Sequence, residues 1–263
     1  YFGRNTNESA LLCAYLYCQS GYQMRLGLGN DRLYLLVASK HQIYESGYWE
    51  IDGMSYYPFN CQEQSLEICG ASFPNEQPLS LLVNESPLFT ERLADSRTLQ
   101  SEHYPNVKVE VSSDENLVSF FATYPTSMLD DNFCTRWSFY ANTPMSERMK
   151  NQLYPSLQSA VKGRSQHEAV NILLNFVQTA FVYEYDDKVW GGDRAFFAEE
   201  SLYYPYCDCE DRSILFSRLV RDLLGLKVLL VYYPGHLATA VHFTESVSGD
   251  YISLDNQKYV VCD

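Results

Sequence analysis

The 263-residue sequence has few basic side chains. It contains 19 Lys and Arg against 33 Asp and Glu, so its formal net charge at pH 7 is −14. A surface of this sign repels phosphate backbones, and no basic stripe interrupts it, which argues against nucleic acid as a partner. The sequence also lacks an apolar run near the ~18–20 residues that a spanning helix needs, so we expect no transmembrane segment in this chain.

Regular cysteine spacing is also missing. The eight cysteines do not follow the pattern of a dense disulfide scaffold. Cys207 and Cys209 lie two positions apart, and no second pair matches them, so the sequence predicts no zinc site. What the sequence has in abundance is aromatic residues, with 22 Tyr and 14 Phe. Such residues are typical of strand packing.

Local patterns predict three segments of an α+β protein. Residues 1–60 read as a helix followed by strands, residues 61–143 as a loop-rich stretch and then a β-rich region, and residues 144–263 as a helical and sheet core. Within the second segment, the residues near 117–124 and 136–141 read as strands. The expected architecture is therefore a helix-on-sheet core preceded by a β-rich N-terminal region.

The C-terminal segment has the clearest pattern. A capping box at Ser165 and Glu168 predicts a helix, and a second amphipathic helix begins near Cys209 and ends at Gly225. Strands are expected at residues 228–233, 237–243, 251–254 and 259–262.

This last part faintly repeats the first 60 residues. If Gly225 is aligned with Gly21, Asn5 falls opposite Cys209, and if Asp255 is aligned with Asp52, Asn60 falls opposite Asp263. One interpretation is a degenerate half-repeat that has lost its nucleophile. The other is two unrelated units of a helix and strands.

Cys209 is the candidate nucleophile. A thiol in the first turn of a helix faces the positive end of the helix dipole and unpaired backbone N–H groups, which favour the reactive thiolate and can hold an oxyanion. The carboxylates of Asp208, Glu210 and Asp211 oppose this, so the site needs an imidazolium nearby. The alternative is a buried structural cysteine.

His236 and Asp263 are the candidate partners of Cys209. His236 follows Gly235 at the mouth of a strand, and its rival His242 lies six residues further along the same strand. Asp263 ends the last strand, where a carboxylate can orient an imidazole and stabilise its charged form. Asp250 and Asp255 are its rivals.

Three motifs follow one another along the chain: CEDRS at the helix start, PGHLATAV at the second strand and YVVCD at the end. In this order they resemble the transglutaminase-like superfamily, and its bacterial cysteine peptidases in particular. The resemblance covers about residues 144–263. It implies a papain-like core with a Cys-bearing helix packed on an antiparallel sheet, a catalytic triad of Cys209, His236 and Asp263, and no cofactor and no metal. The sequence differs from the family at two points. Members often have an aromatic residue two positions after the His, where this sequence has Ala238. They also usually have Pro-Thr after the Asp, which is not seen here.

The resemblance implies a secreted thiol protease or amidase that hydrolyses peptide or side-chain amides through a thioester acyl-enzyme. Its partner would be a peptide or protein substrate, and the sequence leaves the oligomeric state and the choice between water and amine as second nucleophile open. The alternative is a non-catalytic module that binds a peptide or glycan. The chain opens on Tyr1 rather than Met, which fits a removed secretion signal or incomplete coverage. Together with the usual location of family members, this favours an extracytoplasmic location, periplasmic or secreted.

Overall fold

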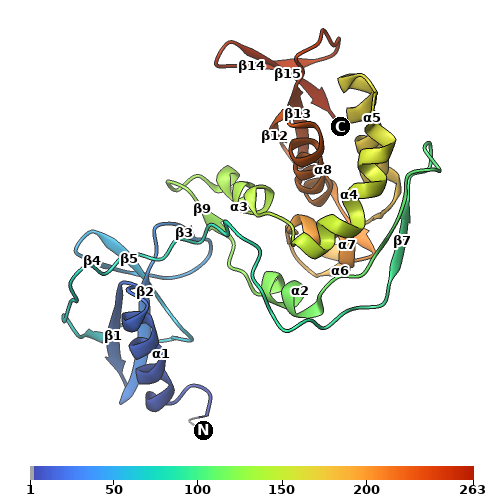
Figure 1. The fold of residues 1–263 in the computed structure, drawn as a ribbon. Helices are drawn as coiled ribbons and strands as arrows, with labels where there is room; N and C mark the ends of the chain where they lie inside the picture. Colours follow the sequence, from blue (N-terminus) through green and yellow to red (C-terminus); the bar gives the residue numbers. More distant parts are fainter. Residues whose placement is uncertain (1–2) are drawn as a thin grey trace. The chain divides into compact units, whose positions relative to one another are not determined.

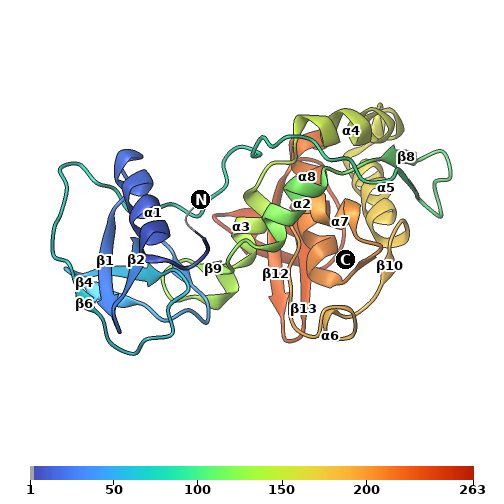
Figure 2. The same ribbon diagram turned by 90° about the horizontal axis from the view of Figure 1, so that it is seen from below.

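The computed structural model describes residues 3–263, which fall into two compact units. Unit 1 runs to Leu81 and takes in Pro125–Arg136, whereas unit 2 consists of Leu82–Tyr124 and Trp137–Asp263. The chain is thus grouped differently from the three segments expected from the sequence. Both units combine helices with antiparallel sheets, so the fold class is α+β (Figures 1 and 2). Among the described residues, no helix has the length and apolar character needed to cross a membrane.

Unit 1 consists of one helix packed on an antiparallel sheet. The strand order is β4-β5-β2-β1-β6, and the helix α1 contacts β1 and β2. The main elements are α1 (Asn7–Gln19), β1 (Met24–Gly29), β2 (Arg32–Ala38), β4 (Trp49–Ile51), β5 (Met54–Pro58) and β6 (Glu67–Ile68). The segment that returns from later in the chain is held by pairing of β3 (Gln42–Ile43) with β9 (Ser127–Met128), and the 3-10 helix η1 (Phe133–Thr135) follows.

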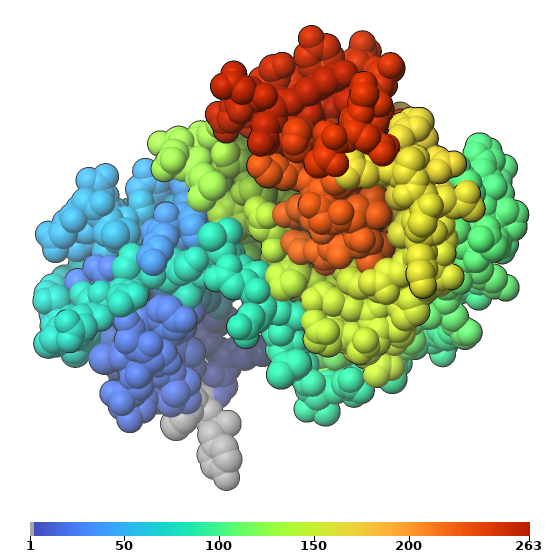
Figure 3. Space-filling model, turned by 45° about the horizontal axis from the view of Figure 1, so that its top comes forward, coloured from blue at the N-terminus to red at the C-terminus, as the bar shows by residue number. Residues whose placement is uncertain are grey.

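Unit 2 is built around a four-stranded antiparallel sheet of order β12-β13-β15-β14, on which helix α8 packs. Figure 3 shows the C-terminal strands, in red, beside helix α5, in yellow. The strands of the sheet are β12 (Lys227–Tyr233), β13 (His236–His242), β14 (Tyr251–Leu254) and β15 (Gln257–Cys262). The helices are α2 (Glu115–Ala122), α3 (Trp137–Asn142), α4 (Glu147–Val161), α5 (Gln166–Thr179), α6 (Asp186–Val189), α7 (Ala198–Tyr203) and α8 (Cys209–Leu224). Two smaller pairs complete the unit, β7 (Arg97–Gln100) with β8 (Lys108–Val111) and β10 (Val182–Tyr183) with β11 (Tyr206–Cys207).

Helix α8 has defined signals at both ends. The side chain of its N-cap Asp208 accepts hydrogen bonds from two backbone N–H groups of the first turn, and Gly225 ends the helix in the left-handed region at φ 65°. The buried face carries Ile214, Leu215 and Leu219, each at most 1% exposed. This face anchors the helix against the sheet and so fixes the position of its first residue.

Two strands predicted from the sequence are not found. Residues near 117–124 and 136–141, expected as strands, lie in helices α2 and α3. In α2, Leu117, Val118 and Phe121 are buried together at helical spacing, so the apolar run is a helix face and not a strand.

The two units share a strand arrangement. In each, a helix is followed by four antiparallel strands whose order in the sheet is first, second, fourth, third. Two residues join the first and second strands in both sheets, and two residues join the third and fourth, as at Asp52–Gly53 and at Asp255–Asn256.

The packing of α8 gives a first prediction. Leu219→Ala should lower the free energy of unfolding of unit 2 by about 2–5 kcal/mol, because it leaves a cavity in a fully buried site. Chemical denaturation followed by circular dichroism measures the change. Leu88→Ala in the same unit, at a side chain 96% exposed, is the matched control and should change stability by less than about 0.5 kcal/mol. Equal effects of the two substitutions would contradict the packing described.

Candidate functional site

Cys209 is the first residue of α8, and the start of this helix is attached to β13. Ser213 Oγ of α8 donates a 2.8 Å hydrogen bond to the carbonyl of Leu237, which follows His236 at the start of β13. The backbone N–H of Leu237 and the hydroxyl of Tyr183 lie near the thiol and lower its pKa. The capping of α8 and the register of β13 therefore determine together where the thiol lies.

His236 and Asp263 form a hydrogen-bonded pair. The Nε2 atom of His236 lies 2.8 Å from Oδ2 of Asp263, and both side chains are partly exposed. Because a carboxylate only accepts hydrogen bonds, Nε2 carries the proton in this pair. In the neutral ring, Nδ1 then has the free lone pair and is the nitrogen able to take a proton from a thiol.

The three predicted residues meet in one small pocket. A cavity of about 90 Å³ is lined by Cys209, His236 and Asp263 together, with α5 forming part of its wall. The rival His242 lies at the other end of β13, where its Nδ1 contacts the carbonyl of Lys258. The structure therefore groups His236, and not His242, with the thiol and the carboxylate.

The surroundings of Cys209 favour the neutral thiol. Burial raises the pKa of Cys209, and the nearby carboxylates of Asp208 and Glu210 raise it further, whereas the Leu237 N–H and the Tyr183 hydroxyl lower it. Burial and the acidic neighbours thus oppose the activating effect expected of the helix start. Proton removal from this thiol depends on an adjacent base.

Tyr183 is a functional candidate that sequence reasoning missed. Burial first, and then the charges of Cys209 and Asp208, raise the pKa of its phenol, so the hydroxyl keeps its proton and acts as a donor. The guanidinium of Arg212 lies 4.9 Å from the centroid of its ring. No local sequence pattern distinguishes Tyr183 from the other tyrosines among the 22 of the chain. Only the tertiary fold brings β10 beside the start of α8.

Trp190, in the loop before α7, packs in a cluster of aromatic side chains. Its ring packs 4.8 Å from that of Tyr204 and 5.7 Å from that of Phe196, and the guanidinium of Arg194 lies 4.5 Å from its centroid. These contacts make it a structural residue of the loop.

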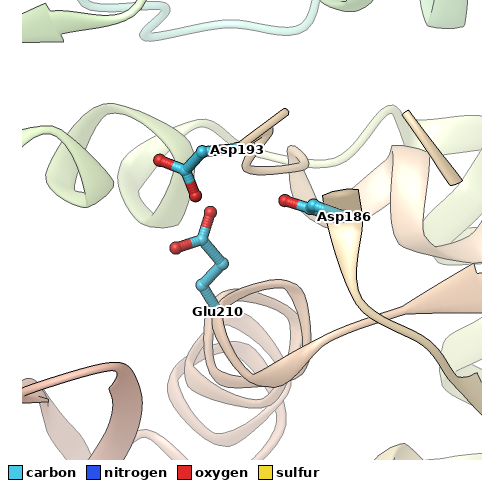
Figure 4. Close-up of side chains that lie close together, drawn as sticks. All are labelled: Asp186, Asp193 and Glu210. Atoms are coloured by element: carbon cyan, nitrogen blue, oxygen red, sulfur yellow. The ribbon is translucent and has the colours of Figure 1, made fainter. Parts of the chain in front are cut away.

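Three carboxylates converge beside the helix start. Figure 4 shows Glu210 of α8 with Asp186 of α6 and Asp193 of the following loop, and one oxygen of each carboxylate lies within 4.8 Å of the other two. Trp137 Nε1 donates a 2.7 Å hydrogen bond to Glu210 and holds one side of the cluster. Like charges at this separation repel, and protonation or a cation would relieve the repulsion.

The cluster has an electrostatic consequence that can be measured. Burial raises the pKa of Asp186 to about 6, with Asp208 and Asp193 adding to the rise, against a lowering by the Arg194 backbone N–H. Burial also raises the pKa of Asp211 well above its usual range. Both carboxyls therefore keep their protons to a higher pH in the folded protein than in the unfolded chain.

We compared this chain with protein families, curated proteins and solved structures. No family model, no curated protein and no solved structure matches it. The chemistry of the site is therefore argued from its residues.

The raised pKa of Asp186 predicts a pH-dependent stability. The folded state binds this proton up to about pH 6, whereas the unfolded carboxyl releases it near pH 4, so the contribution to stability is present below pH 4 and lost as the pH rises to 6. Asp186→Asn removes the ionisable carboxyl and with it this pH-dependent loss of stability. The variant should gain about 2 kcal/mol over the wild type between pH 4 and pH 7, measured by urea unfolding at each pH.

Asp187→Asn is the control, because Asp187 is the exposed neighbour in the same helix. Its unfolding curves should follow those of the wild type at every pH. A constant difference between Asp186→Asn and the wild type across this range would show that Asp186 does not titrate as described.

Proposed function

We propose that unit 2 is a cysteine-dependent hydrolase, a peptidase or amidase, on a papain-like core of the transglutaminase-like type. The observation that carries the proposal is the 2.8 Å hydrogen bond between His236 and Asp263 in the pocket that Cys209 also lines. The order of the three residues along the chain and their places on a helix start and two neighbouring strands support the same reading.

The reaction begins with proton transfer. Nδ1 of His236 takes the proton of the Cys209 thiol while Asp263 holds Nε2 and stabilises the imidazolium. The sulfur then attacks the carbonyl carbon of an amide, and the carbonyl oxygen gains the charge. The amine leaves with the proton from His236, and a thioester remains on Cys209.

The oxyanion needs donors close to the sulfur. The backbone N–H of Leu237 and the hydroxyl of Tyr183 lie near the sulfur, and the backbone N–H of Cys209 is a third candidate donor, because Asp208 already accepts the next two N–H groups of α8. Water activated by His236 then hydrolyses the thioester and restores the thiol. An amine in place of water would give transfer instead of hydrolysis, and the chemistry of this chain's residues is the same for both.

A non-catalytic module that binds a peptide or glycan is the second candidate. The observation in its favour is the raised pKa of Cys209, because a neutral thiol is a weak nucleophile. The two functions differ in what His236 does to the thiol. A direct measurement of thiol reactivity therefore separates them.

Thiol reactivity gives a prediction for the catalytic function. At pH 6.5, iodoacetamide should modify Cys209 at least about tenfold faster in the wild type than in His236→Ala, because the variant has no imidazole to take the proton of this thiol. Quantitative peptide mass spectrometry reports each cysteine separately. All eight cysteines are free, so the exposed Cys134 serves as an internal reference.

His242→Ala is the matched control, since it removes an imidazole from the same strand at the other end. Its Cys209 should react as fast as that of the wild type. If His236→Ala and the wild type react at the same rate, His236 does not act on Cys209, and the binding module is the better proposal.

Turnover gives a separate prediction. Peptides cleaved by the full chain can be found in a mixed peptide pool by mass spectrometry, and one of them then serves for kinetics. Cys209→Ala should abolish cleavage, and Tyr183→Phe should lower kcat by about 10²–10³ with a smaller change in KM, because the hydroxyl acts on the developing oxyanion. Tyr185→Phe, at the exposed next-but-one residue, is the control and should retain full activity. An unchanged kcat in Tyr183→Phe would exclude this hydroxyl as an oxyanion donor.

A further inference from the structure

Unit 1 contains a pocket of about 470 Å³ that the proposed function does not use. It lies at the start of α1, the start of β2 and the end of β5, and its lining includes Arg4, Asn5, Arg32 and Asn60. Its volume falls in the range of small-ligand sites, ~300–1,000 Å³.

The strands around this pocket have the same pairing as those around Cys209. In unit 2, Thr239 of β13 lies opposite Cys262 of β15. In unit 1, Leu36 of β2 lies opposite Pro58 of β5, and one step along, Phe59 N–H donates to the carbonyl of Leu35 at 2.9 Å. Leu35 and Phe59 therefore stand where Thr239 and Cys262 stand, and each pair lines its pocket.

The same register places the partner residues. Arg32 is the first residue of β2 after a two-residue turn, as His236 is the first residue of β13. Asn60 lies eight positions after Asp52 of the next turn, as Asp263 lies eight positions after Asp255. Arg32 and Asn60 thus stand in the places of His236 and Asp263.

The place of Cys209 is taken by Asn7, the first residue of α1. Its Oδ1 accepts the N–H of Leu33 at 2.8 Å, and Leu33 follows Arg32 as Leu237 follows His236. The sequence alignment through Gly21, which put Asn5 opposite Cys209, is shifted because α1 has 13 residues and α8 has 16. Asn5 instead lines the pocket and accepts a hydrogen bond from Asn60 at 3.2 Å.

The chemistry of this pocket differs from that of the Cys209 pocket. It offers two guanidiniums, from Arg4 and Arg32, and two carboxamides, from Asn5 and Asn60, and its described lining contains no Asp or Glu. This is unusual in a chain of net charge −14. Ala10, Tyr17 and Phe59 add an apolar part of the wall. Guanidinium and amide donors beside an apolar wall suit a carboxylate attached to an apolar group.

We propose that unit 1 carries a non-catalytic counterpart of the Cys209 site, which binds the terminal carboxylate of a peptide with an apolar last side chain. Asn7 provides no nucleophile, and its amide is engaged by the backbone of Asp31 and Leu33, so the ligand is held without reaction. The proposal concerns unit 1 alone and does not depend on catalysis by Cys209.

Cys13 makes the binding measurable, because it lines this pocket and is exposed. The probe is N-acetyl-L-phenylalanine, added to the full chain during alkylation with iodoacetamide. A fragment of this size is expected to bind with a Kd of about 1 mM, so 10 mM probe should slow the modification of Cys13 about tenfold. The exposed Cys134, also in unit 1 but outside the pocket, is the reference and should react at its usual rate.

Two variants test the assigned groups. Arg32→Gln removes a cation, and Asn60→Asp adds a negative charge at almost constant shape, so each should abolish the protection of Cys13. Arg164→Gln removes an exposed arginine of unit 2 and should preserve the protection. An unchanged rate at Cys134 and an unchanged circular dichroism spectrum show that the variants are folded.

Three results would overturn the proposal. The first is no protection of Cys13 by 10 mM probe. The second is equal protection by N-acetyl-L-phenylalanine amide, which has no charge, or by inorganic phosphate, which has no apolar group. The third is full protection in both Arg32→Gln and Asn60→Asp.

Discussion

The first turn of α8 is the constraint on which unit 2 depends. Asp211 is completely buried, and its carboxyl accepts hydrogen bonds from the N–H of Phe196 and of Asp208. The side chain of Asp208 accepts in return from the N–H groups of Glu210 and Asp211. These bonds fix the residue at which the helix begins and attach the long preceding loop to it. Cys209 has a defined position because both of these are fixed.

The same arrangement concentrates negative charge around the thiol. Burial raises the pKa of Cys209 and raises that of Asp186 to about 6, and the carboxyls that cap the helix and hold the loop add to both rises. The carboxyls that stabilise the first turn of α8 therefore also make the Cys209 thiol less reactive. In the reaction proposed above, His236 removes the proton of the thiol, and the hydrogen bond to Asp263 orients His236. This is why thiol reactivity, and not geometry alone, tests the function.

Sequence patterns predicted the parts of unit 2 that local interactions determine. The start of α8 follows from Asp208 and its end from Gly225, and the strands β12–β15 follow from turns and alternation. Residues near 117–124 were predicted as a strand because Phe120 and Phe121 favour strands locally. Packing within unit 2, such as that of Phe121 on Phe197, selects a helix instead. Tyr183 was missed for a different reason. Its contact with Cys209 joins two segments whose proximity no local pattern encodes.

The two pockets show how one strand arrangement can support different chemistry. In both, a helix start, the first residue of the second strand and the residue after the fourth strand meet at one edge of the sheet. With Cys209, His236 and Asp263 at these places, a proton can pass along a chain of titratable groups. In unit 1, Arg32 and Asn60 line the pocket and can donate hydrogen bonds to a ligand, whereas the amide of Asn7 is held by the backbone. The backbone thus determines where a ligand meets the chain, and three side chains determine whether it can react there.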